Sequence, residues 1–235
     1  KVEESARKAV CGEAMAEVAC IDNAFLIVED DKIADFGKME DLKETNADKI
    51  VDANNRFVLP SFCDSHTHLV YAGSREIEYI DKIRGLSYEE IAKRGGGILN
   101  SAKRLQEASE DQLFEDAMKR LEEIASMGTG AVEIKSGYGL TTEAELKMLR
   151  VIRRLKEASP LTIRANFLGA HGVPMEYRGN QGAFVDLVIN EMIPLVAKEK
   201  LADFIDVFCD TGFFTVEETD RMLEAGVRHG MIPKI

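Results

Sequence analysis

Two histidines separated by a single residue, His66 and His68, are the strongest candidates for chemistry in this sequence. They follow the apolar stretch 57–62, which is typical of a β-strand. Residues i and i+2 of a strand point to the same face, so the two imidazoles can aim at one point, as a metal ion requires. Neutral imidazole suits zinc or iron. The alternative is a pair of unrelated surface histidines, but the chain has only four histidines, and the spacing favours a metal site while leaving the reaction open.

A third histidine, His171, follows the apolar segment 163–168 on a turn flanked by glycines. In parallel α/β folds the carboxyl ends of the strands are where functional sites are built, so His171 is a second candidate. The alternative is a loop histidine that caps a helix. His229 lies in the last turn of a predicted helix, where a histidine interacts favourably with the helix dipole, and we give it no role in the site.

Tyr138 and Arg75 are weaker candidates. Gly137 and Gly139 flank Tyr138 and would let the backbone turn sharply and present the phenol to a cavity, although a core tyrosine in a strand-to-helix turn is an equally good interpretation. Arg75 is either a solvated loop residue or a bidentate clamp for a substrate carboxylate. The triplet 95–97 is all glycine, but no strand precedes it and no Lys-Ser/Thr follows, so we interpret it as a loop near the site and not as a phosphate cradle.

The first part of the chain, residues 1–57, reads as a small antiparallel β unit. Acidic residues 29–31 form a turn between two apolar segments, which predicts a hairpin. The strands expected in this unit cover residues 24–28, 32–37, 50–52 and 57–59.

From Pro60 onward, strands alternate with amphipathic helices. The strands are expected at 131–135, 163–168, 204–208 and 231–235, and the helices at 112–127, 142–157, 184–200 and 216–229. Thr142 and Glu145 match a capping box at the start of the second helix, and Pro194 should break or kink the third. Repeated βα units imply a parallel sheet, and this many in series suggest a barrel.

The composition limits the possible partners. The chain of 235 residues is 45% hydrophobic and 31% charged, with a formal net charge of -12. That balance argues against nucleic acid or an anionic membrane as the main partner, because both need clustered cations. No apolar run is long enough to span a bilayer, no signal peptide is apparent, and four scattered cysteines indicate reduced thiols in a cytoplasmic protein.

Taken together, the motifs resemble one family. Residues 58–68, which end in Asp64-Ser65-His66-Thr67-His68, are similar to the metal-binding entry segment of the amidohydrolase superfamily. Four further segments narrow the resemblance to the imidazolonepropionase family: Gly73-Ser74-Arg75-Glu76, Gly95-Gly96-Gly97-Ile98-Leu99, Lys135-Ser136-Gly137-Tyr138-Gly139-Leu140 and Leu168-Gly169-Ala170-His171. The resemblance runs from about Ile21 to Ile235.

The resemblance implies an α/β fold in which residues 58–235 form the first part of a (β/α)8 barrel and residues 1–57 part of a small β-sandwich-like domain. It implies one catalytic Zn or Fe ion, a cytoplasmic homodimer, and hydrolysis of 4-imidazolone-5-propanoate to N-formimino-L-glutamate in histidine degradation. The alternatives are another amidohydrolase, such as a guanine or cytosine deaminase, and an inactive metal-binding homologue.

The family's site residues carry over position by position. His66 and His68 resemble the first two metal ligands, and His171 resembles the catalytic histidine that binds the substrate ring and, with the metal, stabilises the developing oxyanion. The residues that resemble the substrate-holding side chains are Arg75, on the propionate, Tyr88 and Tyr138. Lys135 sits where binuclear relatives place a metal-bridging lysine, but a family with one metal gives it a structural role.

The resemblance also predicts what should follow Ile235. A third metal-binding histidine is expected directly after it, an acid/base glutamate within the next turn, and an aspartate ligand on a later strand. On this interpretation the chain holds half of a site and is inactive alone.

Overall fold

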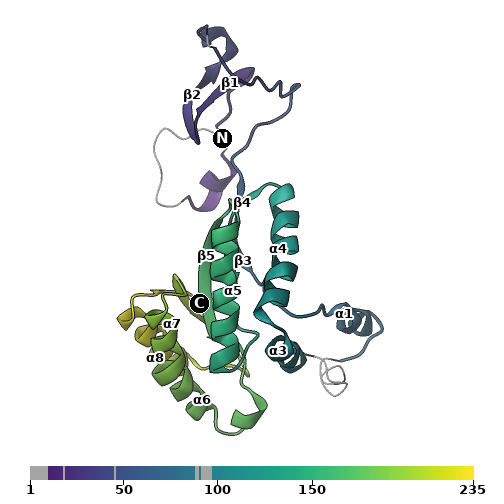
Figure 1. The fold of residues 1–235 in the computed structure, drawn as a ribbon, viewed down its shortest axis with the longest axis vertical. Helices are drawn as coiled ribbons and strands as arrows, with labels where there is room; N and C mark the ends of the chain where they lie inside the picture. The colour runs from purple at the N-terminus through teal and green to yellow at the C-terminus, as the bar shows by residue number, and fades with distance from the viewer. Residues whose placement is uncertain (1–9, 18, 45, 88–89, 91–96) are drawn as a thin grey trace. The chain divides into compact units, whose positions relative to one another are not determined.

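The structure is a computed structural model that describes residues 10–17, 19–44, 46–87, 90 and 97–235 (Figure 1). The chain divides into two compact units, Lys1–Pro60 and Ser61–Ile235. The division falls a little beyond the expected boundary at residue 57.

The first unit contains one antiparallel hairpin. Strand β1 (Ala24–Glu29) pairs with β2 (Lys32–Lys38), as predicted, with an irregularity between Ile27 and Val28. Two short 3₁₀ helices, Gly12–Ala16 and Met39–Asp41, complete the described secondary structure of the unit.

Two further strands that we predicted in this unit, at 50–52 and 57–59, are wrong. Both segments are described and neither forms a strand. The Asp52 carboxylate instead accepts a hydrogen bond from the Asn54 amide at 2.7 Å, and Asn54 and Asn55 adopt left-handed backbone angles. Such a local turn competes with strand pairing. The β-sandwich-like domain stays a prediction.

The second unit is built on a parallel sheet of five strands in chain order, β3 to β7. Their bounds are β3 (Phe62–Thr67), β4 (Thr129–Lys135), β5 (Thr162–Ala170), β6 (Phe204–Val207) and β7 (Ile232–Pro233). The predicted α/β class and parallel sheet are confirmed. The described sheet is open, with β3 and β7 at its edges, so closure into a barrel stays a prediction.

Helices connect the strands. The structure contains α1 (Glu76–Ile83), α3 (Ile98–Glu107), α4 (Glu110–Ser126), α5 (Thr142–Ala158), α6 (Gln181–Leu187), α7 (Ile193–Lys198) and α8 (Val216–Arg228). Helices α1 and α3 were not predicted. Between α6 and α7 the chain forms a π-helical turn, Val188–Met192, and Pro194 stands in the first turn of α7, so the predicted interruption at the proline is confirmed.

The start of α5 differs from the prediction. Its N-cap is Thr141, whose backbone is extended and whose hydroxyl accepts from the Ala144 amide at 3.3 Å. Thr142 is already helical and donates its hydroxyl to Glu191. Glu145 is therefore one residue too late for a capping box, and its carboxylate bonds elsewhere.

The hydrophobic core of the second unit lies between the sheet and its helices. Helices α4 and α5 lie side by side and contact β4 and β5 respectively (Figure 1). The buried face of α4 consists of Leu113, Ala117 and Leu121, which recur at helical spacing. Within the described part of the chain, no helix has both the length and the apolar character needed to cross a membrane.

Candidate functional site

The carboxyl end of β3 carries the histidine pair. His66 belongs to the strand and His68 follows its last residue, Thr67. The Thr67 hydroxyl donates to the Glu133 carbonyl of β4 at 2.6 Å, which fastens this end of β3 to its neighbour. The two imidazole rings lie 5.7 Å apart, centroid to centroid. The geometry thus brings both rings together at one strand end.

Two more rings join the pair from the neighbouring strands. The Tyr138 ring, just beyond β4, lies 5.0 Å from the His68 ring. The His171 ring, just beyond β5, stacks on His68 at 5.2 Å with an interplanar angle of 11° and lies 5.3 Å from Tyr138. Phe208, which follows β6, approaches His171 edge-on at 5.8 Å. Sequence-predicted site residues from three consecutive strand ends therefore form one cluster.

A backbone hydrogen bond fixes the orientation of His171. Its Nδ1 lies 3.1 Å from the Gly137 carbonyl oxygen. A carbonyl can only accept, so Nδ1 carries the proton, and Nε2 of the neutral ring is left as an acceptor. Gly137 has φ +109, and a β-carbon there would lie 2.9 Å from the Leu168 carbonyl oxygen and 3.0 Å from the His171 ring. The close approach explains the glycine.

The cluster disfavours protonated imidazoles. Burial lowers the pKa of His68 to about 4, and the positive charges of His171, His66 and Lys135 act in the same direction. Burial also lowers the pKa of His171, against the opposing effect of its bond to Gly137. Burial raises the pKa of Tyr138. At neutral pH the site presents neutral His68 and His171 rings and a protonated phenol.

These features fit a Zn or Fe ion at the histidine pair. A metal needs neutral imidazole ligands, and the pKa of His68 meets that requirement. His68 Nδ1 is buried and has no hydrogen-bond partner among the described residues. His66 and His68 would hold the ion. The described ranges contain no group of three or more His, Cys, Asp or Glu side chains placed to bind a metal, so the pair would supply part of a ligand set.

A buried network of charges supports the strands that carry the cluster. Lys135 Nζ lies 2.9 Å from Glu133 Oε1 and also contacts Asp206. The Asn166 amide donates to Glu133 at 2.8 Å and to Asp206 at 3.0 Å. Burial would raise the pKa of Glu133, but Lys234, Asn166 and Lys135 outweigh it and hold that pKa below its usual value. Lys135 is paired with Glu133 and Asp206 in this network, and the structural role expected of it stays a prediction.

One feature of the sequence indicates this network. Glu133 and Lys135 are charged residues at i and i+2 of an otherwise apolar strand, and both are buried. Charged residues are almost never fully buried unless paired, so the pattern indicates buried partners. Asn166 and Asp206 stand in two other buried strands.

Arg75 lies at the start of α1 and is engaged by Glu78, with Nε 2.8 Å from Glu78 Oε2. Glu78 also accepts from the Gly97 amide at 2.9 Å, which links α1 to the start of α3. The positive charge of Arg75 opposes the rise in the pKa of Tyr138 that burial causes. Tyr88, the remaining predicted substrate residue, lies outside the described residues.

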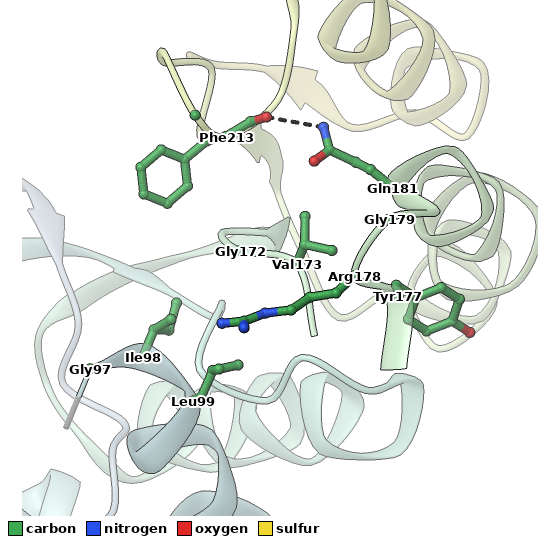
Figure 2. A pocket seen from close by; sticks show the side chains of 11 residues that line it. Gly97, Ile98, Leu99, Gly172, Val173, Tyr177, Arg178, Gly179, Gln181 and Phe213 are labelled. Carbon is green, nitrogen blue, oxygen red and sulfur yellow. Dashed lines mark hydrogen bonds between the residues drawn. The ribbon is translucent and has the colours of Figure 1, made fainter. Parts of the chain in front are cut away.

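A cavity of about 340 Å³ lies beside the loop that follows His171 (Figure 2). Its walls come from the first residues of α3, the segment 172–181 and the turn at 212–213. Gln181 closes one side by donating to the Phe213 carbonyl at 3.0 Å, and Figure 2 shows Arg178 extending between Leu99 and Val173. None of the clustered rings lines this cavity, so it is a neighbour of the ring cluster and not the same site.

Comparison with curated proteins finds imidazolonepropionases. The protein from Flavobacterium johnsoniae is 56% identical over 235 residues, which is 100% of this chain and 57% of the relative. The relative from Christiangramia forsetii is 57% identical over 226 residues, 96% of this chain and 55% of its own length. The relative from Brevibacillus brevis is 47% identical over 231 residues, 96% of this chain and 54% of its own. The chain thus spans about half the length of these relatives.

Solved structures agree on the fold. 5-Methylcytosine deaminase from Klebsiella pneumoniae, liganded with 5-fluorocytosine, matches with a TM-score of 0.61 at 15% identity, over 88% of this chain and 46% of the deaminase. At that identity the match concerns the fold alone. No family model matches the chain. The resemblance predicted from the motifs is confirmed by the curated relatives: over its whole length the chain is similar to part of the imidazolonepropionases.

Proposed function

We propose that this chain contributes to a hydrolase that opens the ring of 4-imidazolone-5-propanoate and yields N-formimino-L-glutamate. The observation that carries the proposal is the cluster of His66, His68, Tyr138 and His171 at three consecutive strand ends, in a chain 56% identical to an imidazolonepropionase over its full length. A bound Zn or Fe ion would supply Lewis acidity that activates water at neutral pH.

His171 would orient the substrate ring. Because its Nδ1 donates to the Gly137 carbonyl, its neutral Nε2 can accept a hydrogen bond from a ring N–H. The resemblance instead predicted that His171 stabilises the oxyanion. A hydrogen bond to an oxyanion needs a donor, so Nε2 would have to carry a second proton on the ring. The lowered pKa of His171 disfavours that proton, so we assign the ring-holding role.

Tyr138 would act as a donor. Its pKa is raised by burial, so the phenol keeps its proton at neutral pH and can donate to the carbonyl oxygen of the ring amide. A donor aimed at an oxygen that gains negative charge in the transition state accelerates acyl transfer. The amide carbon then gains a water oxygen, the ring C–N bond breaks and the nitrogen leaves with a proton.

Arg75 would hold the propionate carboxylate. A guanidinium presents a planar fork that matches a carboxylate, and the charge of Arg75 acts on Tyr138. Its present partner, Glu78, would have to share or yield the guanidinium when the substrate arrives. Tyr88 stays a predicted substrate residue from the resemblance.

A substrate panel tests the proposal. The protein to use carries this chain at the length of the imidazolonepropionases that it matches, and is called the full-length protein below. We expect it to hydrolyse 4-imidazolone-5-propanoate and to leave cytosine and guanine unchanged, since those bases have no carboxylate for Arg75. Deamination of a nucleobase without ring opening of the imidazolone would replace the proposal by the deaminase alternative.

The resemblance further predicts a homodimer located in the cytoplasm, and the net charge of -12 argues against a nucleic-acid or anionic-membrane partner. Light scattering of the full-length protein would test the dimer: a mass of twice the protomer is expected, and a monomer at micromolar concentration would contradict it.

A further inference from the structure

Glu145, in the first turn of α5, is fully buried and has no role in the mechanism so far. It belongs to the few buried charged residues of the described chain, but unlike Lys135, Glu133 and Asp206 it stands apart from the charge network beneath the cluster. Burying a carboxylate is costly unless hydrogen bonds satisfy it. The hydrogen-bond partners of the Glu145 carboxylate therefore indicate which part of the structure it stabilises.

Those partners are the backbone amides of the loop between β4 and α5. Glu145 Oε2 accepts from the Gly137 amide at 2.9 Å, and Oε1 accepts from the amides of Gly139 at 2.7 Å and Leu140 at 3.0 Å. The Ser136 hydroxyl also bonds to the carboxyl group. One side chain thus ties down the loop on both sides of Tyr138.

The loop needs such an anchor because its backbone is unusual. Gly137 has φ +109 and Leu140 has φ +56, and the left-handed region is rarely adopted by a residue with a side chain such as leucine. The loop also packs against the start of α5 with no room between them. A β-carbon at Gly139 would lie 2.5 Å from the Glu145 amide nitrogen and 2.9 Å from its Oε1.

The anchored loop carries two contacts to the ring cluster. Tyr138, between the anchored amides of Gly137 and Gly139, lies 5.0 Å from the His68 ring. The Gly137 carbonyl, on the residue whose amide Oε2 holds, accepts from His171 Nδ1 at 3.1 Å. Displacement of the loop would therefore move the phenol and release the His171 ring together.

We propose that Glu145 is a positioning residue for the ring cluster: its buried carboxylate fixes the 137–140 backbone so that Tyr138 and His171 face the substrate. The inference rests on the proposed function for its kinetic consequence, but its structural part stands without it. Helix capping does not account for the carboxylate, because Thr141 already caps α5. A capping glutamate would bond to the N-cap amide, whereas this one bonds to residues before the helix.

The test compares Glu145→Gln with Glu143→Gln in the full-length protein. Glutamine keeps the size of the side chain and an acceptor for Gly139 and Leu140, but it turns an NH₂ group toward the Gly137 amide, where both groups are donors. Glu143 lies in the same turn of α5 and is exposed, so its variant is a matched control. The readouts are hydrogen exchange of the 136–141 segment, circular dichroism, kcat and KM.

We expect Glu145→Gln to speed amide exchange of that segment by about tenfold or more while the helices keep their exchange rates. We expect kcat/KM to fall by about 10- to 100-fold, since small misplacements of catalytic groups have effects of that size. Glu143→Gln should stay within about twofold of the parent in both measurements, as surface substitutions commonly do.

A double-mutant cycle with Tyr138→Phe separates positioning from general destabilisation. If Glu145 acts through the loop that carries Tyr138, adding Glu145→Gln to Tyr138→Phe should lower kcat/KM by clearly less than it does in the parent, because coupled residues are not additive. Losses that simply multiply would overturn the proposal, as would parental exchange and kinetics in Glu145→Gln.

Two arms keep the test decisive. If Glu145→Gln does not fold, Gly139→Ala takes its place, because the added β-carbon would lie 2.5 Å from the Glu145 amide nitrogen and 2.9 Å from its Oε1. It would therefore push the loop away from the start of α5 and its buried carboxylate, and it should produce the same pattern. If the parent protein opens no imidazolone ring, the proposed function fails, and the exchange measurement still decides whether Glu145 holds the loop.

Discussion

Replacing Lys135 with methionine should destabilise the protein strongly. Lys135 is buried between the carboxylates of Glu133, at 2.9 Å, and Asp206. Methionine fills a similar volume but leaves both carboxylates without their shared cation. Removal of one partner from a buried ion pair costs about 3–5 kcal/mol.

The expected loss lies at the lower end of that range, because part of the network survives. Glu133 keeps Lys234 and the Asn166 amide, and Asp206 keeps the Asn166 amide at 3.0 Å. We therefore expect the free energy of unfolding to fall by about 3 kcal/mol. The urea m-value is about 1–3 kcal/mol/M for small proteins and rises with size, so the unfolding midpoint of the full-length protein should drop by roughly 0.5–1 M.

The assay is urea unfolding of the full-length protein, followed by circular dichroism. Lys119→Met is the matched control, because Lys119 pairs with Asp116 at 3.5 Å and its side chain is 73% exposed. Exposed pairs contribute about 0–1 kcal/mol, so this variant should unfold almost as the parent does. A Lys135→Met midpoint equal to that of Lys119→Met would refute the argument that the buried network holds the strands together.

Three further predictions concern the site. Arg75→Lys keeps the positive charge but loses the planar guanidinium that can bind a carboxylate with two hydrogen bonds, so it should raise KM for 4-imidazolone-5-propanoate by about tenfold with little change in kcat. Arg84→Lys, at an exposed position after α1, should change neither constant. Unchanged kinetics in Arg75→Lys would show that Arg75 does not bind the propionate. Replacing His66 and His68 together with asparagine should abolish stoichiometric metal in elemental analysis, whereas His229→Asn should retain it; full occupancy in the double variant would exclude the pair as ligands. Burial lowers the pKa of His68 from 6.5 to about 4, so between these pH values the unfolded chain binds a proton at His68 that the folded metal-free protein does not bind. The contribution of His68 to the free energy of unfolding is therefore fully present above pH 6.5, and about 3 kcal/mol is lost as the pH drops toward 4. A His68→Gln variant with the same pH dependence in urea unfolding would contradict this origin.

Much of the site could be predicted from sequence because its residues stand in short local motifs at strand ends. The spacing of His66 and His68, and the glycines around Tyr138 and His171, require only the local backbone to be interpreted. A parallel sheet then brings consecutive strand ends to one edge, and the rings meet there. Their chemical roles stay predictions.

What could not be predicted depends on contacts between distant segments. Lys135 and Asp206 are 71 positions apart, and Asn166 and Glu133 are 33 apart, so no local pattern specifies which buried charges will pair. Glu145 was misassigned for a different reason. The T-x-x-E pattern fits a capping box, but the helix begins one residue earlier than the pattern implies, and the freed carboxylate folds back onto the loop.

The same local reasoning failed for the segments 50–52 and 57–59. Their apolar residues are typical of strands, yet a strand forms only where a neighbour pairs with it. In the described part of the first unit, β1 and β2 pair only with each other, and Phe57 remains 90% exposed.

We propose that the ring cluster of this chain serves an imidazolone-opening hydrolase. The most direct measurement is the rate of N-formimino-L-glutamate formation from 4-imidazolone-5-propanoate by the full-length protein, beside the same protein with Tyr138→Phe and with His171→Asn. We predict ring opening by the parent and a loss of about tenfold or more in kcat/KM for each variant. We predict no turnover by the 235-residue chain alone, because the proposed ligands His66 and His68 are two where a catalytic zinc normally requires three from the protein. Ring opening that is unaffected by either substitution, or carried out by the chain alone, would contradict the assignment.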